Sequence, residues 1–502
     1  MCEDRRNLVE YTIGRREPSM LLELTGMRLY TIKELEKEFG IPWRYARHLL
    51  LKNHLESVVK DERIFVTEAS LKDYLAKPPE ERKAKRVSFL KKIGPGIITG
   101  AADDDPSGIG TYSTVGARFG LGLSWLALYL LPLMTSVQET CARIGIVTGK
   151  GLAGALKKKF GNTTVFILVM LLLVANTVNI GADIGAMAAA ANMIIGINFF
   201  IAAAVFTVTI IALEVFVSYH RYAYILRWLV LSLLAYLLTA LIIKPDWIEV
   251  ARAIAVPRID FNLAFLTANV AVIGTTISPY LFFWQSSQEV EEERDRKVLS
   301  DRHAAIIREE VRIMRSDVIR GMSIANLAFL FIIITTAFVL FKNGITDIET
   351  AQQAAEALRP LAGNFSGLIF TLGIVGTGML AIPVLAGASA YAISEVLKWR
   401  EGLSLKFRKA HGFYGIIIVS TFVGMLMNFI GVNPITALYY TAVINGLVAS
   451  VLLVFIFMIG NDPKIMGTHT NPAWVKVFGS IATLFMGISS LVLIGTFFFG
   501  GT

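Results

Sequence analysis

The hydrophobic positions of this chain gather into long blocks, and these begin at about residue 93. A helix needs about 20 apolar residues to cross the hydrocarbon core of a bilayer, and the blocks have that length. The pattern therefore predicts an all-α integral membrane protein with eleven transmembrane spans. They cover about residues 93–117, 121–145, 163–190, 197–218, 226–244, 265–288, 318–341, 365–396, 412–431, 434–459 and 474–499.

The chain before the first span is polar and has its own pattern. After an extension over residues 1–27, residues 28–76 predict helix, turn, helix, hairpin and helix, with Thr31 as the first helix cap. This succession is similar to a winged helix-turn-helix domain of the excisionase or MerR type, a small α+β fold. The proline-containing basic stretch 77–92 predicts a linker to the membrane domain, residues 93–502.

A domain of this type would present Arg44 and Arg47 on its second helix to a DNA groove. Acidic and basic residues are interleaved along it, however, which is more typical of a solvated surface. Nucleic acid is therefore the less favoured partner. Tethered to the membrane, the domain could equally serve as a regulatory or dimerising module.

Composition agrees with a membrane protein and indicates its orientation. The chain is 54% hydrophobic and 17% charged, and its mean hydropathy is +0.59. Basic residues concentrate in the connections 144–161, 291–317 and 397–411, which an eleven-span count places on the side of the N-terminus. The positive-inside rule then puts the N-terminus in the cytoplasm and the C-terminus outside, in the plasma membrane of a prokaryotic cell. The net charge of +9 needs no nucleic acid, because such loops face anionic lipid.

Two spans are interrupted near their middle. The first reads IGPGIITGAADDDPSGIGTYSTVGA, and the sixth contains TTISPYLFFWQ. Proline removes a backbone donor, and carboxylates at bilayer depth mark a functional site by default. The breaks occupy corresponding positions in two halves of five spans. This is the pattern of an inverted-repeat transporter with an ion site near the midplane.

The motif GPG, followed after eight residues by DP, resembles the first span of the Nramp family of divalent metal transporters, and QETCARIGIVTGKGLA resembles the stretch after its second span. The likeness covers about residues 93–460. It implies a LeuT-type fold of two inverted five-helix repeats, to which the eleventh span is an addition. It also implies a transported metal ion and no resident cofactor. We expect no enzyme activity, because no catalytic motif is present.

The resemblance places the metal-binding aspartate of the family on Asp105. The asparagine ligand of the family falls on Gly108, and its ligand methionine in span six falls on Ser278. Both side-chain ligands are therefore replaced by smaller residues. The predicted metal site consists of Asp105, Ala102, Thr275, Ser278 and Gly108.

Groups that the family links to proton movement are also replaced. Its histidines after the span-six proline match Tyr280 and Gln285, and its acidic pair in span three matches Asn179 and Ala182. Asp183 is the nearest acid and is expected to point elsewhere on the helix. The residues predicted to line the pathway are Asp103, Asp104, Thr276, Asn179, Tyr280, Gln285 and Asn445.

These replacements indicate the transported ion. Thioethers favour softer transition metals, whereas Mg²⁺ prefers oxygen ligands and keeps several waters. The motifs ADDDPSG and TISPYLFFWQ are similar to the Nramp-related magnesium transporters. We predict uptake of Mg²⁺, with Mn²⁺ also accepted, and no proton coupling. The alternatives are a proton-coupled Mn²⁺ or Fe²⁺ transporter, a membrane-anchored metal-sensing regulator, and an organic-solute symporter, whose anionic substrates the three aspartates would repel.

Overall fold

The computed structural model describes residues 29–39, 41, 46, 49, 55–60, 63–76, 94–217, 233–295 and 304–499. The chain divides into two compact units, each of which is described by itself. One contains the N-terminal domain, and the other begins at Pro95 and holds most of the helices.

The N-terminal unit contains a small antiparallel sheet with strand order β1-β3-β2. The strands are β1 (Leu29–Thr31), β2 (Ser57–Lys60) and β3 (Arg63–Thr67), and the helices with described bounds are α3 (Ile32–Phe39) and α5 (Glu68–Ala76). Thr31 and Glu34 exchange hydrogen bonds at the start of α3, as in a capping box. The core side chains are Tyr30, Leu35, Ile41, Ala46, Leu49, Leu55, Val66, Leu71 and Tyr74. The predicted hairpin is thus present, and Arg44 and Arg47 lie outside the described residues.

The second unit is helical throughout its described residues. Its α-helices are α6 (Pro95–Asp103), α7 (Pro106–Phe119), α8 (Trp125–Thr148), α9 (Leu152–Ile195), α10 (Phe199–Phe216), α12 (Leu234–Ile243), α13 (Trp247–Ala255), α14 (Leu263–Thr276), α15 (Pro279–Asp295), α16 (Ala304–Val339), α17 (Ala351–Glu356), α18 (Arg359–Ala362), α19 (Ser366–Leu397), α20 (His411–Met427), α21 (Pro434–Gly460), α22 (Pro463–Met466) and α23 (Ala473–Phe499). The ends of α15 and α16 that meet at the gap 296–303 belong to the first unit. Short 3-10 turns are η4 (Phe341–Asn343), η5 (Gly363–Phe365), η6 (Phe407–Lys409), η7 (Asn428–Ile430) and η8 (Gly467–His469).

Eight helical segments among the described residues are long and apolar enough to cross a membrane. The chain is therefore a helical membrane protein, as its hydropathy predicts. Three of the predicted spans are not among these eight segments. The first corresponds to α6 and α7, the second to α8, and the fifth to the ten-residue helix α12. Part of the fifth span lies outside the described residues.

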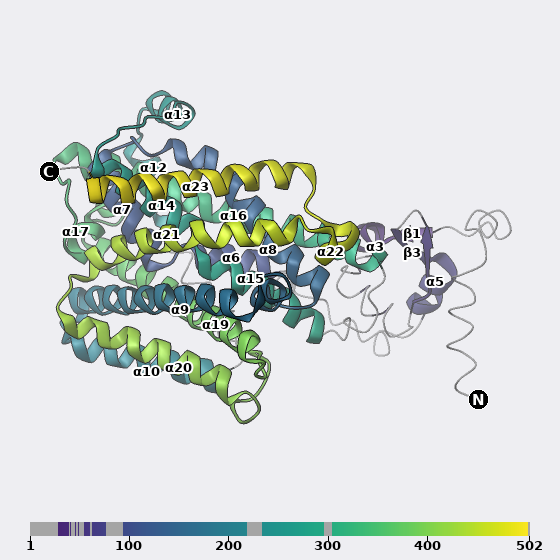
Figure 1. Cartoon of the computed structure of the whole chain (residues 1–502). Coiled ribbons are helices and arrows are strands. Elements are labelled where there is room, and N and C mark those ends of the chain that lie inside the picture. Colours follow the sequence, from purple (N-terminus) through teal and green to yellow (C-terminus); the bar gives the residue numbers. More distant parts are fainter. Residues whose placement is uncertain are drawn as a thin grey trace. The chain divides into compact units, whose positions relative to one another are not determined.

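Figure 1 shows the long helices running roughly parallel to one another, with α9 beside α19 and α21 beside α23. Small residues allow close contact between helices. A Cβ atom at Gly274 would lie 2.2 Å from the carbonyl oxygen of Ala442, and one at Gly100 would lie 2.3 Å from that of Gly321. Such contacts hold α14 against α21 and α6 against α16, which fixes the position of both interrupted spans.

Candidate functional site

The first interrupted span is broken at its aspartates. Helix α6 ends at Asp103 and α7 begins at Pro106, so Asp104 and Asp105 lie between two half-helices. Asp105 has extended backbone angles, which is the conformation that a following proline favours. Its side chain caps the N-terminus of α7, where unpaired backbone N–H groups favour negative charge.

The second break separates α14, which ends at Thr276, from α15, which begins at Pro279. The Ser278 hydroxyl lies 2.7 Å from the carbonyl oxygen of Thr275 and 3.0 Å from that of Gly274. Thr276 Oγ1 donates to the carbonyl oxygen of Val272 at 2.6 Å. The Ser278 hydroxyl thus bonds carbonyl groups at the end of α14 that the interrupted helix leaves without an N–H donor.

The two breaks lie next to each other, and Gly108 is the residue between them. A Cβ atom at Gly108 would lie 3.4 Å from Asp105 Oδ1 and 3.4 Å from Thr275 Oγ1. Thr275 Oγ1 is buried and has no hydrogen-bond partner within the described residues. Because Gly108 has no side chain, Asp105 Oδ1 and Thr275 Oγ1 approach the same point of α7.

Two tyrosine hydroxyls connect the broken helices. Tyr280 donates a 2.8 Å hydrogen bond to the carbonyl oxygen of Ala102, and the Tyr112 hydroxyl lies 3.2 Å from Thr276 Oγ1. One bond therefore joins Ala102 to Tyr280, and a separate one joins Thr276 to α7.

Asp105 is almost completely buried, and both of its carboxylate oxygens accept hydrogen bonds. Oδ1 accepts from the Ser107 hydroxyl and from the Gly108 N–H, each at 2.7 Å. Oδ2 accepts from Asn179 Nδ2 at 2.9 Å, and Asn179 Oδ1 in turn accepts from Asn445 at 3.3 Å. The predicted pathway residues Asn179 and Asn445 thus reach the site from α9 and α21.

Asp183 does not point elsewhere on its helix, contrary to expectation. Asn179 Nδ2 donates to Asp183 Oδ2 at 3.3 Å, and the Asp183 carboxylate interacts with the Ser107 N–H and with Asp105. The sequence held the signal for this arrangement, because residues four apart lie on one face of a helix. The prediction compared Asp183 with the family motif and overlooked its spacing from Asn179.

The other predicted pathway residues lie around α6 and α15. Asp103 and Asp104 are both buried, and one oxygen of each has no hydrogen-bond partner in the described part of the chain. Gln285 accepts from the Thr99 hydroxyl at 2.5 Å and donates to Glu289 at 2.9 Å. Gln285 therefore links the half-helix α6 to Glu289 on α15.

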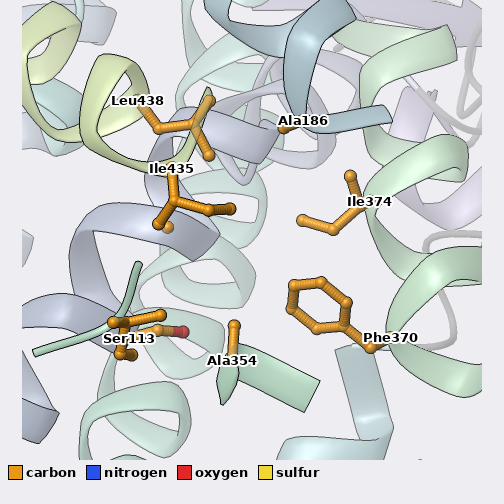
Figure 2. A pocket seen from close by; sticks show the side chains of 9 residues that line it. Ser113, Ala186, Ala354, Phe370, Ile374, Ile435 and Leu438 are labelled. Carbon is orange, nitrogen blue, oxygen red and sulfur yellow. The ribbon is translucent and has the colours of Figure 1, made fainter. Parts of the chain in front are cut away.

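A small apolar pocket lies along α7, one to two turns beyond Asp105. Figure 2 shows Ile435 and Leu438 of α21 on one side of it and Phe370 and Ile374 of α19 on the other. A Cβ atom at Gly110 would lie 2.6 Å from Leu438 Cδ1, so α7 and α21 are in close contact there. Apart from Ser113 the lining is apolar, which distinguishes this pocket from the polar surroundings of Asp105.

The arrangement around Asp105 is suited to a small hard cation. It offers carboxylate, hydroxyl and amide oxygens on elements that half-helices and buried hydrogen bonds hold in place. Among the described residues, no three His, Cys, Asp or Glu side chains are placed to hold a metal ion together.

Comparison with known proteins agrees with this geometry. Residues 96–496 match the Nramp family, described as natural resistance-associated macrophage protein-like. The divalent metal cation transporters MntH of Klebsiella pneumoniae and Bacillus subtilis are each 24% identical to the chain. They cover 83% and 82% of it, and 96% and 93% of their own length.

Solved structures show the same fold. A manganese transporter of Eremococcus coleocola has a TM-score of 0.67 at 18% identity and covers 82% of this chain and 88% of its own. MhsT in complex with L-phenylalanine has a TM-score of 0.56 at 12% identity and covers 82% of this chain and 98% of its own. The fold is thus of the LeuT-like type, and the family match over 96–496 establishes that the chain belongs to the Nramp family.

Proposed function

We propose that this protein carries divalent cations into the cell across the plasma membrane, with Mg²⁺ as its main substrate and Mn²⁺ also accepted. The observation that carries the proposal is the buried Asp105 carboxylate, which lies at a helix break beside Gly108 and Thr275. The curated relatives are named as divalent metal cation transporters, and the structural relative as a manganese transporter.

The oxygen-rich character of the site supports Mg²⁺. At the family ligand positions stand Gly108 and Ser278, and Ser278 directs its hydroxyl to backbone carbonyl groups. Mg²⁺ prefers oxygen and retains water, so a site without a side-chain ligand at position 108 suits a partly hydrated ion. Ala102, Thr275 and Asp105 are the remaining proposed ion ligands.

A nearby thioether supports the acceptance of Mn²⁺. Met187 packs against Gly378, where a Cβ atom would lie 2.4 Å from the Met187 sulfur and 3.2 Å from Pro106 Cγ. Pro106 follows Asp105 directly, so a thioether lies near the residue next to the proposed ligand, and thioethers favour softer ions than Mg²⁺.

We also propose that transport is not coupled to protons. The family histidine positions hold Tyr280 and Gln285, and both take part in fixed hydrogen bonds. Neither side chain titrates near neutral pH. The membrane potential alone, at about 2.3 kcal/mol per charge per 100 mV, favours entry of a divalent cation.

The topology proposed with this function has eleven spans in two inverted repeats of five plus one helix. The N-terminus is in the cytoplasm and the C-terminus is outside. Residues 28–76 are proposed to form a winged-helix module that regulates transport. Its sheet and its packed core support a folded domain. DNA binding through Arg44 and Arg47 stays a prediction, tested by a salt titration of full-length protein with duplex DNA.

The test is ion entry into liposomes that contain the purified protein, a Mg²⁺-sensitive dye and, in a parallel sample, a pH dye. Wild type should admit Mg²⁺ without acidification, and Asp105→Asn should abolish entry. Glu214→Gln is the matched control. It removes a buried carboxylate from α10, away from the site, and should keep the wild-type rate.

Two results would contradict the proposal. Mn²⁺ entry with acidification and no Mg²⁺ signal would establish a proton-coupled manganese transporter. A wild-type protein that moves neither ion, but changes its DNA affinity with metal, would indicate a membrane-anchored regulator.

A further inference from the structure

The site contains a second carboxylate that the family motifs do not place there. Asp183 lies on α9 and is completely buried. A single NH₂ group, that of Asn179, contacts both Asp105 Oδ2 at 2.9 Å and Asp183 Oδ2 at 3.3 Å. The Ser107 N–H also interacts with both carboxylates. The two acids therefore flank one position at the N-terminus of α7.

Several oxygens at this position lack partners. Asp183 Oδ1, Thr275 Oγ1 and Asn445 Oδ1 are buried and make no hydrogen bond to any described residue. A buried polar atom without a partner is destabilising, so three such atoms on helices that meet near Asp105 require an explanation. All three are oxygens, and oxygen atoms are the ligands that a hard cation seeks.

We propose that Asp183 is the second carboxylate of the cation site, and that the bound divalent ion lies between Asp105 and Asp183, where the Asn179 NH₂ group lies in this structure. This inference rests on the proposed function and identifies a further residue of the same site. The carboxylates of Asp105 and Asp183 together balance the charge of one divalent ion, which the Asp105 carboxylate alone does not.

Ion binding requires that the Asn179 NH₂ group, which contacts the two carboxylates, be replaced by an oxygen. The pair Asn179 and Asn445 can make this change. Asn179 directs its NH₂ group at the carboxylates and its oxygen at Asn445. When both side-chain amides rotate by about 180°, Asn179 presents its oxygen to the ion and its NH₂ group to Asn445 Oδ1. The Asn445 oxygen, which has no partner among the described residues here, then gains a donor, and the bond between the two asparagines is kept with its direction reversed.

The dimensions favour an ion that keeps some of its water. The spacings of 2.9 and 3.3 Å around the Asn179 nitrogen exceed the Mg²⁺–oxygen distance of about 2.1 Å. One carboxylate therefore binds the ion directly and the other through a retained water. Because dehydration of Mg²⁺ is costly, this arrangement selects for charge and size rather than for ligand softness.

The test measures Mn²⁺ binding to the full-length protein in detergent by the loss of the free-ion EPR signal, with Mg²⁺ as competitor. Asp183→Asn should weaken Mn²⁺ binding at least about tenfold, and Mg²⁺ should compete less well. Asp183→Glu restores the charge and should recover most of the affinity. Glu214→Gln, which removes a buried carboxylate outside the site, should bind as wild type does.

Thermal unfolding separates an ion ligand from a structural residue. Without ion, Asp183→Asn should unfold at the wild-type temperature, and it should lose the stabilisation that saturating Mn²⁺ gives wild type. If Asp183→Asn binds Mn²⁺ as wild type does, Asp183 is not a ligand, while the proposed function stands. If wild type binds neither Mn²⁺ nor Mg²⁺, the proposed function and this inference both fail.

Discussion

The Tyr280 hydroxyl donates a 2.8 Å hydrogen bond to the carbonyl oxygen of Ala102 and so ties the second helix break to the first. Tyr280 follows Pro279 directly, and Ala102 lies one residue before the end of α6. Both residues are fully buried. The contact fixes the direction of a carbonyl group that is a proposed ion ligand, at a place where the helix no longer pairs it.

Tyr280→Phe tests the role of that carbonyl group. The change removes the Tyr280 hydroxyl, so the buried Ala102 oxygen loses its hydrogen-bond donor. We expect the free energy of unfolding without ion to fall by about 1–3 kcal/mol, measured by thermal unfolding. A bound cation would supply a new partner, so saturating Mg²⁺ should reduce the difference from wild type. A difference that is the same with and without Mg²⁺ would mean that the Ala102 oxygen does not contact the ion.

Gly108→Asn tests the basis of ion selectivity. The Cβ contacts at this position are all 3.3 Å or longer, so a side chain enters the site with small adjustments. The added amide occupies space that a hydrated ion needs and supplies a ligand instead of water. We expect Mg²⁺ entry to fall and the Mn²⁺ to Mg²⁺ ratio to rise about tenfold in competition uptake. Gly108→Ala fills space without a ligand and should lower entry of both ions alike. If the ratio of Mn²⁺ to Mg²⁺ uptake is unchanged in Gly108→Asn, Gly108 does not determine ion selectivity.

The sequence predicted the parts of this site that follow from local rules. Proline and aspartate placed the breaks beside Asp105 and Pro279, because the effect of proline acts on its own helix. The sequence did not predict the position of the Asp183 carboxylate, because that position depends on how α9 is rotated against α7. It also did not predict the bond from Tyr280 to Ala102. Both relationships are between residues far apart in sequence, and packing of whole helices decides them.

A charge cluster around the fully buried Glu139 predicts a large effect on stability. Glu139 on α8 contacts Arg143 and accepts 2.9 Å hydrogen bonds from both Nε and Nη2 of Arg315 on α16. Glu139→Gln leaves two arginines without a counter-charge, and should cost about 3–5 kcal/mol in thermal unfolding. Glu356→Gln is the control, because its ion pair with Arg359 is on the surface and should be worth less than about 1 kcal/mol. If both variants lose the same free energy of unfolding, the contact of Glu139 with Arg315 does not stabilise the packing of α8 against α16.

The close contact of α14 with α21 should govern both stability and transport. Gly274 precedes Thr275, and a Cβ atom there would lie 2.2 Å from the Ala442 oxygen and 2.4 Å from the Gly446 nitrogen. Both are backbone atoms, so Gly274→Ala must push the helices apart, at a cost of about 1–3 kcal/mol. It should also slow Mg²⁺ entry, because the shift displaces Thr275 from Gly108.

Gly415→Ala in α20 is the control. Its added Cβ atom meets no heavy atom within 4 Å, so the change should be neutral or stabilising by up to about 1 kcal/mol, with normal Mg²⁺ entry. Unfolding temperature and dye uptake measured on both variants separate the two effects. A Gly274→Ala protein that is less stable but transports normally would show that Thr275 does not set the geometry of the site.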